Sequence, residues 1–531
     1  MKTSLNSVGA EVPRDPVTTE AVPGGTSSMP SASNVASAAS RQPFLKKVTS
    51  FPVLLATLLV AAVFVPLRDF NVDPDLWWHL KVGQGILSTH RWPTMDTYSF
   101  TVPGSPWIAY EWLGEALLAG VHAAWGLRGL MMLNLALGSA ILLGLYALAS
   151  LRSGNSKAAF VASALLLPFA VSFFTLRPQM WGYLFLIVTL IVLERFREGR
   201  TGTLWLLPPL FLVWVNTHGS FAIGLFAVAV YCIGGLVKYR CGGLESILWT
   251  PVQRVHLGLV IVASLLALAV TPYGTKLAAY PLDMAFSQPV NVANIKEWQP
   301  MPFNLPVGQY FLVLLVGFVL AQIVLRLAWQ LPELTLFLAG VVAACLHVRF
   351  LLVFVPFSAP LFAVILSRWV APYAPGKDKH ALNAFLITAV IVCIVWFLPS
   401  RAQVDERVAE NWPVKAVAYL EQQPPPLPMF NSYTYGGYLL YKFDGRNKVF
   451  VDGRADIYER AGVLVDYRSI TWLEPKALSL LQSYNVQSCF IGRNEPLATL
   501  LSASPQWKRV YADDMSALFV RNKAADRSGE R

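Results

Sequence analysis

Residues 68–112 read RDFNVDPDLWWHLKVGQGILSTHRWPTMDTYSFTVPGSPWIAYEW, a polar and aromatic segment between the first apolar run of the chain and all the later ones. Its carboxylates Asp73, Asp75 and Glu111 follow closely on that first run, Phe51 to Leu67. A run that crosses a membrane outward would place these acids at the outer membrane surface. Because a positioned carboxylate can take up a proton during group transfer, the segment is predicted to be an active-site loop.

The composition sets the class of protein. Hydrophobic residues make up 55% of the 531 positions and charged residues only 14%, which indicates a polytopic membrane protein rather than a soluble one. The 42 Lys and Arg against 31 Asp and Glu give a net charge of +11. These basic residues concentrate in short connections between apolar runs, where they orient spans, so no nucleic-acid partner is expected.

The apolar runs predict about eleven transmembrane helices, several near the ~20 residues that cross a bilayer. The runs are residues 51–67, 129–149, 158–176, 178–194, 203–216, 219–237, 255–272, 307–327, 333–346, 350–367 and 382–399. The run 113–125, LGEALLAGVHAAW, is short, carries Glu115 and His122, and is amphipathic enough to lie flat in the interface. Counting it as a span would place every later connection on the opposite side of the membrane.

Loop charges decide the orientation, because Lys and Arg in short loops prefer the cytoplasmic side. With 113–125 lying flat, the predicted cytoplasmic connections all carry positive charge: 152–157, 195–200, 238–254, 326–332 and 368–379. The predicted outside connections hold fewer Lys and Arg: 175–178, 216–219, 272–306 and 347–349. A multi-pass protein of the cytoplasmic (inner) membrane follows, with its N-terminus cytoplasmic and its C-terminal part outside.

Three domains are predicted. Residues 1–45 are rich in Ser, Ala, Pro and Thr and are interpreted as a disordered cytoplasmic tail, and 46–399 as the transmembrane domain with the outside loop 68–128. Residues 400–531 are charged and predicted to form a small extracytoplasmic α/β domain. Its expected strands are 428–431, 448–452 and 488–491, its expected helices 412–423, 434–442, 455–468 and 474–485, and its expected terminal hairpin pairs 509–512 with 516–521.

The sequence Asp73-Pro74-Asp75 suggests a catalytic or cation-binding site. Two carboxylates two residues apart can converge on one cation, such as a divalent metal, or share the work of a general base. The alternative is that Asp75 caps a helix running from Leu76 to Leu87 while Asp73 only makes a turn.

The order of parts resembles a known family. A first span, an outside loop with an early acidic residue, a helix at 80–88, a Trp92-Pro93 turn and a flat helix that ends at Trp125-Gly126 are similar to the membrane glycosyltransferases of the C superfamily, which have the GT-C fold. The resemblance covers roughly residues 50 to 370 and is nearest to members that use polyprenyl-phosphate sugars. It implies that Asp73 or Asp75 is the catalytic base and that a lipid-linked sugar in the membrane is the substrate, with a glycan, lipid or protein acceptor. The C-terminal part lacks the Trp-Trp-Asp acceptor motif of oligosaccharyltransferases, which argues against protein N-glycosylation.

A sugar leaving a lipid phosphate needs cations on that phosphate. Arg177 and Arg349 both fall in predicted outside connections, and a guanidinium can fork onto phosphate oxygens. The alternative is that either one extends to the lipid headgroups or pairs with an acid from a neighbouring loop.

Further polar residues complete the predicted site. Its substrate-binding candidates, besides the two arginines, are His79, Glu111, His218, Lys276 and Glu297. An ordinary turn is the alternative for the segment that contains His218, and a structural interfacial loop for 272–306. In the C-terminal domain, Asp452, Arg454 and Asp456 are expected either to contact the acceptor or to dock the domain onto the membrane part.

The sequence thus predicts a GT-C-like polytopic helical protein that transfers a sugar from polyprenyl phosphate, with inversion, at the outer face of the cytoplasmic membrane. In this prediction Asp73 is the base, Asp75 is its helper or a metal ligand, and Arg177 and Arg349 hold the phosphate. A transporter or flippase for a lipid-linked sugar is the alternative from another class, and a non-enzymatic assembly factor of the envelope is a third.

Overall fold

The computed structural model describes residues 44–522, without the side chains of Ala285 and Asn294. The described residues from Val48 onward belong to one compact unit. The predicted cytoplasmic tail, residues 1–45, lies almost wholly outside the described residues, which begin with α1 (Phe44–Val48).

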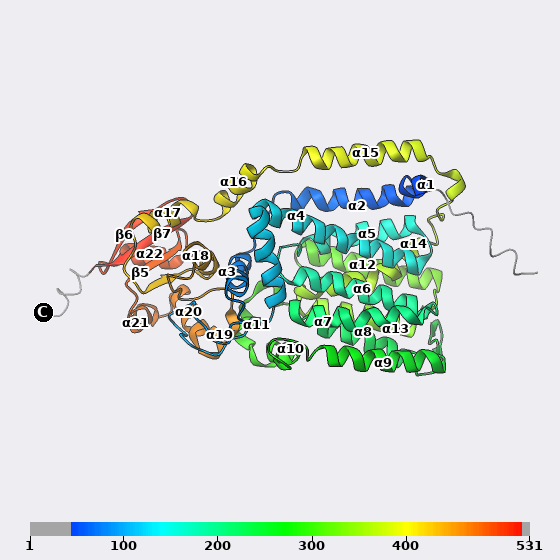
Figure 1. Ribbon diagram of the computed structural model, residues 1–531, viewed down its shortest axis with the longest axis horizontal. Helices are drawn as coiled ribbons and strands as arrows, with labels where there is room; N and C mark the ends of the chain where they lie inside the picture. The colour runs from blue at the N-terminus through cyan, green and yellow to red at the C-terminus, as the bar shows by residue number, and fades with distance from the viewer. Residues whose placement is uncertain (1–43, 523–531) are drawn as a thin grey trace, which may run out of the picture. The chain divides into compact units, whose positions relative to one another are not determined.

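Every apolar run of the sequence coincides with a helix in the described residues. These helices are α2 (Phe51–Leu67), the second part of α4 (Trp112–Ser153), α5 (Ser156–Val171), α6 (Gln179–Arg197), α7 (Leu207–Thr217) with the 3-10 turn η1 (Thr201–Leu206) before it, α8 (Phe221–Gly234), α9 (Pro251–Ala267), α12 (Pro306–Leu325), α13 (Leu331–Leu346), α14 (Leu351–Leu366) and α15 (His380–Trp396). They run side by side in nearly one direction (Figure 1).

The outer surfaces of these helices are apolar. In the described chain, four helices are long and apolar enough to cross a bilayer alone, namely α4, α6, α12 and α14 together with its preceding turn η3 (Val348–Phe350). Large side chains such as Leu266 of α9, Val313 of α12 and Phe385 of α15 are 67%, 65% and 69% exposed. Such a wide apolar surface needs lipid to cover it, so the chain is a polytopic membrane protein. The number of crossings, about eleven, stays a prediction.

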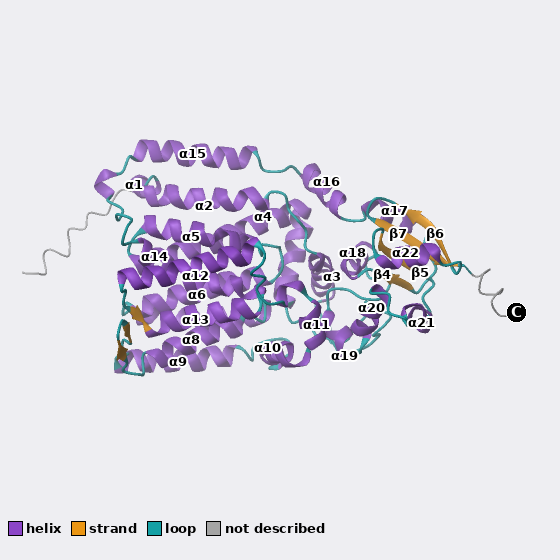
Figure 2. Ribbon diagram, turned by 180° about the vertical axis from the view of Figure 1, so that it is seen from behind, coloured by secondary structure: helices purple, strands orange, loops and turns teal. Residues whose placement is uncertain are grey.

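The five connections predicted to be cytoplasmic meet at one end of the bundle. Glu333 at the start of α13 pairs with Arg152 of α4 and with Arg197 of α6, the latter at 2.9 Å. Asn155 donates to the carbonyl of Val370 at 2.7 Å, and the short strand β2 (Leu244–Glu245) pairs with β3 (Trp329–Gln330) and with β1 (Arg240–Cys241). Figure 2 shows this small sheet at the end of the bundle that lies away from the larger sheet. The charge alternation read from the sequence therefore matches a real separation of the two sets of connections.

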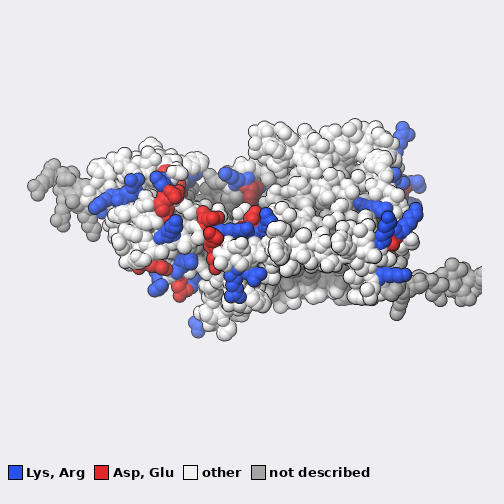
Figure 3. All heavy atoms as spheres, turned by 90° about the horizontal axis from the view of Figure 1, so that it is seen from above, with Lys and Arg blue, Asp and Glu red and all other residues white. Residues whose placement is uncertain are grey.

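On the face that Figure 3 shows, charged side chains avoid the middle of the bundle. The band without Lys, Arg, Asp or Glu is bounded by mostly basic residues at one end and by basic and acidic residues together at the other. A band of this kind is expected where hydrocarbon surrounds the protein.

The outside loop folds into two helices that cross the direction of the bundle (Figure 1). They are α3 (Pro74–Thr89) and the first part of α4, which is separated from the second part by the non-helical backbone of Gly126 at φ 65° and ψ −159°. Only glycine adopts this conformation without strain, so the Trp125-Gly126 pair ends the flat helix as the sequence predicted. Segment 272–306 lies at the same end and forms α10 (Lys276–Ser287), α11 (Pro289–Asn294) and the 3-10 turn η2 (Lys296–Trp298).

The start of α3 differs from the expectation. The helix begins at Pro74, and Asp73 rather than Asp75 is its N-cap, with Asp73 Oδ1 accepting from the Asp75 backbone N–H at 3.0 Å. The reason is that proline suits the first helical position, where its missing N–H is not needed and its φ is already helical.

The C-terminal residues form an α/β fold around a four-stranded sheet of order β4-β5-β7-β6, in which only β4 and β5 are parallel. Its elements are α16 (Arg401–Asn411), α17 (Val414–Gln422), β4 (Met429–Asn431), α18 (Tyr433–Lys442), α19 (Ala455–Arg460), α20 (Val463–Thr471), α21 (Ala477–Ser483), β5 (Ser488–Gly492), α22 (Pro496–Ala503), β6 (Trp507–Ala512) and β7 (Ser516–Arg521). The expected hairpin is β6 and β7. The helices α16 and α22 were not expected, and the expected helix 455–468 is broken into α19 and α20.

The expected strand 448–452 is wrong as a strand of this sheet. Val449 instead exchanges backbone hydrogen bonds with the outside loop, donating to the Tyr98 carbonyl and accepting from Phe100 N–H, each at 3.1 Å. The segment is extended, as its apolar residues predicted, but it pairs with a partner about 350 residues earlier in the chain.

Candidate active site

The guanidinium of Arg177 lies among three carboxylates at the end of the bundle that carries α3 and η2. Its Nε is 3.4 Å from Asp73 Oδ2, its Nη1 is 3.0 Å from Asp75 Oδ2, and its Nη2 is 3.0 Å from Glu297 Oε1. Arg177 comes from the connection between α5 and α6, the two aspartates from the start of α3, and Glu297 from η2. Four of the predicted site residues therefore meet around one charge.

Each aspartate uses its two oxygens differently. Oδ1 of Asp73 caps α3, and Oδ1 of Asp75 accepts from the indole N–H of Trp78 at 3.2 Å. Both Oδ2 atoms face Arg177. The Oδ1 contacts hold the two carboxylates in place. The Oδ2 atoms pair with the guanidinium of Arg177, and a substrate can compete with them for this cation.

Burial shifts the proton affinities in this cluster. It raises the pKa of Asp75 to about 6, with a further rise from the charge of Asp73 that Arg177 opposes. Burial alone lowers the pKa of Arg177, but the charges of Asp73, Asp75 and Glu297 outweigh it and the net shift is upward. Arg177 is therefore always charged, and Asp75 changes its protonation just below neutral pH.

Arg349 forms the second half of the cluster. Its Nη1 is 3.4 Å from Glu297 Oε2, and its Nη2 donates to Gln179 Oε1 at 3.0 Å. The guanidinium also lies over the ring of Trp298, 5.3 Å from the ring centroid. Glu297 thus bridges Arg177 and Arg349, and its side chain, 31% exposed, is the most accessible of the carboxylates around Arg177.

A buried chain of histidines and glutamates lies beneath the aspartates. His79 Nδ1 is 3.1 Å from Glu115 Oε1, and His79 Nε2 is 3.5 Å from Glu111 Oε2. On the other side of Glu111, Oε1 is 3.3 Å from His218 Nε2. The predicted residues His79, Glu111 and His218 therefore belong to one network, and Ser220 Oγ completes it at 2.8 Å from His218 Nδ1.

Burial favours the neutral forms of the groups in this chain. Burial raises the pKa of Glu111 to about 8 and lowers the pKa of His218 to about 3, and the charges of Arg349 and Arg177 lower the latter further. Burial also lowers the pKa of His79 well below its usual value. The Ser220 backbone N–H donates to His218 Nδ1 at 3.0 Å, so in the neutral ring Nε2 carries the proton and faces Glu111 Oε1 as a donor. A protonated Glu111 can then donate from Oε2 to His79 Nε2.

Two polar partners were missing from the predicted site. Glu115 is four residues after Glu111, a spacing that puts both on one face of a helix, but its place in an apolar run made it look interfacial. Gln179 opens α6 two residues after Arg177 and gave no signal of its own.

Lys276 is apart from this cluster. It starts α10 with an exposed side chain, and among the described residues the ion pairs around Arg177 and Arg349 do not include it. Its substrate-binding role stays a prediction.

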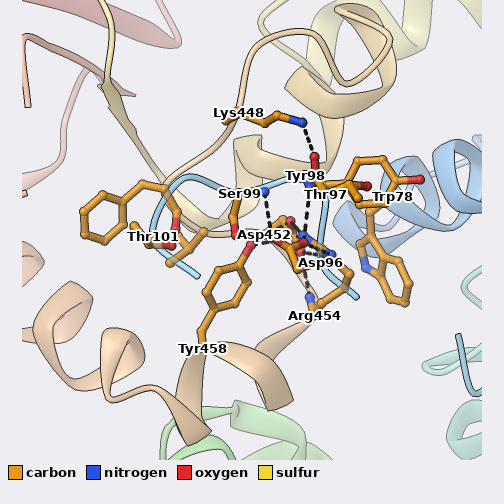
Figure 4. Close-up of polar contacts among 12 residues, drawn as sticks. Trp78, Asp96, Thr97, Tyr98, Ser99, Thr101, Lys448, Asp452, Arg454 and Tyr458 are labelled. Carbon is orange, nitrogen blue, oxygen red and sulfur yellow. Dashed lines mark hydrogen bonds and ion pairs between the residues drawn. The ribbon is translucent and has the colours of Figure 1, made fainter. Parts of the chain in front are cut away.

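The C-terminal candidates Asp452 and Arg454 lie in a separate, fully buried network (Figure 4). Arg454 forks onto Asp452, with Nε to Oδ1 at 2.8 Å and Nη2 to Oδ2 at 2.6 Å, and its Nη1 reaches Asp96 Oδ1 of the outside loop at 2.5 Å. Tyr458 donates to Asp452 Oδ2 at 2.9 Å, and the guanidinium lies 4.9 Å from the ring centroid of Trp107. With no exposed surface, this network fastens the C-terminal domain to the loop, which is the docking alternative for these two residues.

Asp456 lies beside this network. Its side chain is buried, the nearest cation is Arg460 at 4.0 Å, and burial raises its pKa to about 6 against the charges of Arg460 and Arg454. A role in acceptor binding stays a prediction for this residue.

The cluster does not offer a metal site. Among the described residues there is no group of three or more His, Cys, Asp or Glu placed to hold an ion. The Oδ2 atoms of Asp73 and Asp75, the ligands expected for a divalent metal, both face the guanidinium of Arg177.

Comparisons with known proteins identify the fold. No protein-family model and no curated protein sequence matches the chain. Among solved structures, ArnT from Cupriavidus metallidurans bound to undecaprenyl phosphate matches with a TM-score of 0.50 at 14% identity, over 89% of this chain and 98% of ArnT. The oligosaccharyltransferase of Archaeoglobus fulgidus tethered to an acceptor peptide matches with a TM-score of 0.49 at 13% identity, over 88% of this chain and 74% of that one. The GT-C fold expected from the order of parts is confirmed.

Proposed function

We propose that this membrane protein with the GT-C fold is a glycosyltransferase that moves a sugar from a polyprenyl-phosphate donor to an acceptor at the outer face of the cytoplasmic membrane. The observation that carries the proposal is the pair of guanidinium groups, Arg177 and Arg349, held beside the carboxylates Asp73 and Asp75 at one end of the bundle. The structural likeness to ArnT, which was solved with a polyprenyl phosphate bound, agrees with a lipid phosphate as ligand.

Glu297 occupies the position that the donor phosphate would take. Among the described residues it is the one acid that contacts both Arg177 and Arg349, so its two oxygens bridge the guanidiniums in the way that two phosphate oxygens would. The phosphodiester of a polyprenyl-phosphate sugar, exchanging with Glu297, would leave Asp73 and Asp75 in place. Because η2 belongs to the segment 272–306 between apolar helices, Glu297 can withdraw with this segment as the donor enters.

The proton acceptor is one of the aspartates. In the proposed reaction an acceptor hydroxyl attacks the anomeric carbon, the bond from that carbon to the phosphate oxygen breaks, and the hydroxyl proton passes to a carboxylate. Asp75 suits this task, because its pKa of about 6 is near neutral pH and its side chain, 25% exposed, is more open than that of Asp73 at 13%. The sequence-based assignment of the base to Asp73 stays a prediction, which matched variants of the two residues test.

Arg177 and Arg349 stabilise the leaving group. As the carbon–oxygen bond breaks, the electron pair stays on the phosphate, and two fixed guanidiniums hold the charge that develops there. The stacking of Arg349 on Trp298 and its hydrogen bond to Gln179 keep this cation in position without neutralising it. The attack from the opposite side predicts inversion at the anomeric carbon.

A direct assay tests the proposal. Purified full-length protein is incubated with a panel of radiolabelled polyprenyl-phosphate sugars, and release of polyprenyl phosphate is followed with and without candidate acceptors. We expect release with one donor and its loss in Arg177→Gln, whereas Arg493→Gln, an exposed substitution in the C-terminal domain, keeps the wild-type rate. Movement of an intact donor across proteoliposomes without bond cleavage would replace the transferase by the flippase alternative.

A further inference from the structure

A second basic site lies at the outer end of α2, away from the Arg177 cluster. A cavity of about 300 Å³ opens where the end of α2 meets the end of α15 and the start of α16. Its polar lining is Arg68, Gln403 and Arg407, and its apolar lining includes Trp396, Phe397 and Leu398. From this cavity we infer that the protein binds the phosphodiester headgroup of an anionic phospholipid in the outer leaflet.

The arginines of this cavity have N–H donors that a ligand can use. The Nε of Arg68 is buried without a hydrogen-bond partner in the described structure, and the nearest acid, Asp69 Oδ1, is 3.9 Å away. Arg407 uses Nη1 for the carbonyl oxygen of Arg68 at 2.5 Å and for Asp69 at 3.3 Å. A buried N–H without an acceptor costs free energy, and an oxygen of a bound phosphate would satisfy it.

The charge of the site favours an anion. Arg68 and Arg407 contribute two positive charges and Asp69 one negative charge, and Arg128 adds a further cation, whose Nε donates to the carbonyl of the lining residue Pro399 at 3.0 Å. A phosphodiester carries one negative charge, and a guanidinium fork fits its two free oxygens. A zwitterionic lipid brings no net charge and gains less from this environment.

The surroundings indicate a lipid rather than a soluble anion. Trp396 and Phe397 close the apolar helix α15 with 79% and 57% of their surfaces exposed, so they face the acyl chains and headgroups at the membrane boundary. Figure 3 looks onto this side of the molecule and shows basic and acidic side chains gathered where the uncharged band ends. The cavity therefore has an apolar wall for the glycerol and acyl chains and a cationic wall for the phosphate.

Lipid binding to the full-length protein tests the inference. The protein in detergent is titrated with phosphatidylglycerol and, separately, with phosphatidylcholine and inorganic phosphate, while bound lipid is counted by native mass spectrometry and the unfolding midpoint is followed. We expect phosphatidylglycerol to be retained and to raise the midpoint, with weak effects of the other two. Arg68→Gln is expected to weaken the apparent affinity roughly tenfold, the loss of one charge-assisted hydrogen bond.

A matched control separates a site from general charge. Arg401→Gln removes an exposed arginine of the same helix α16 that does not line the cavity, and it should leave lipid binding unchanged. Arg68 makes no side-chain hydrogen bond in the described structure, so its replacement should not impair folding, and the Arg68→Gln and Arg407→Gln double variant should lose retention altogether. Equal losses in Arg401→Gln and Arg68→Gln, or equal stabilisation by inorganic phosphate, would overturn the inference.

Discussion

Arg177 and Arg454 each gather carboxylates from distant parts of the chain, yet the two clusters differ in almost every physical respect. Around Arg454 the side chains have no exposed surface and the closest ion pairs measure 2.5 and 2.6 Å. Around Arg177 the carboxylates are 13–31% exposed and the pairs measure 3.0–3.4 Å. The comparison teaches that the same residue types serve two purposes: a closed network holds two parts of the fold together, and a looser one keeps a cation ready for exchange.

The closed network explains how the C-terminal domain holds the loop that carries the aspartates. Arg454 joins Asp452 of that domain to Asp96 of the outside loop, and the loop in turn carries α3 with Asp73 and Asp75. Oδ2 of Asp96 also accepts from Ser99 N–H at 3.1 Å and from Ser99 Oγ at 2.6 Å. The buried charges thus fix the loop from which the aspartates extend.

Removing the guanidinium from the closed network should have the largest effect on stability. Arg454→Gln leaves Asp96 and Asp452 buried without their cation, which costs about 3–5 kcal/mol of unfolding free energy. The measurement is denaturant unfolding of the purified protein, with rate per folded molecule as the second readout. A destabilisation below about 1 kcal/mol would show that the network is not closed to water, and would remove the contrast with Arg177.

Removing one carboxylate from the cluster around Arg177 should mainly affect the rate of sugar transfer. Asp75→Asn keeps an oxygen for the Trp78 indole but cannot take up a proton at neutral pH, so we expect sugar transfer to fall by at least ~100-fold with little change in the unfolding midpoint. Asp73→Asn is the matched variant, because asparagine caps a helix as well as aspartate does and α3 stays intact. A larger loss of rate in Asp73→Asn than in Asp75→Asn would return the role of base to Asp73.

The apolar runs and the two arginines were predictable because their signals are local. A run of apolar residues is conspicuous in any sequence, and an arginine such as Arg177 or Arg349 next to such a run is rare enough to draw attention. The kink after Trp125 was predictable for the same reason, since Gly126 follows it directly. Local composition therefore led to the helices and to one end of the bundle, whereas the GT-C fold was expected from the resemblance in the order of parts.

The partners of those residues were not predictable, because they are set by contacts between distant segments. Asp96 and Arg454 are 358 positions apart, and the segment around Val449 has the composition of an inner strand although it pairs with the loop. The bridging position of Glu297 likewise depends on how segment 272–306 folds back over the bundle. The pattern of residues within one segment does not indicate which distant segment it will contact.

The pH dependence of the rate should report the protonation of Asp75 in the cluster around Arg177. Burial and the charge of Asp73 raise the pKa of Asp75 to about 6 while Arg177 opposes them, so the carboxylate is protonated and inactive as a base below that pH. We expect kcat/KM to be flat above about pH 7 and to fall roughly tenfold per unit below about pH 5. A profile measured from acid to neutral pH checks this, and a rate that stays flat down to about pH 4 would mean that the base has an ordinary carboxyl pKa.

The smallest effect is expected from an exposed ion pair that joins the same two parts of the fold as Arg454 does. Lys81 of α3 pairs with Asp444 of the C-terminal domain, whose side chain is 75% exposed. Water and salt screen such a pair, so Asp444→Asn should change the unfolding free energy by less than about 1 kcal/mol and leave the rate unaltered. Denaturant unfolding of Asp444→Asn beside Arg454→Gln measures how much burial contributes, because both variants remove one ionic contact between the loop and the domain. Equal losses in the two variants would mean that the number of ionic contacts, and not their separation from water, holds the domain to the loop.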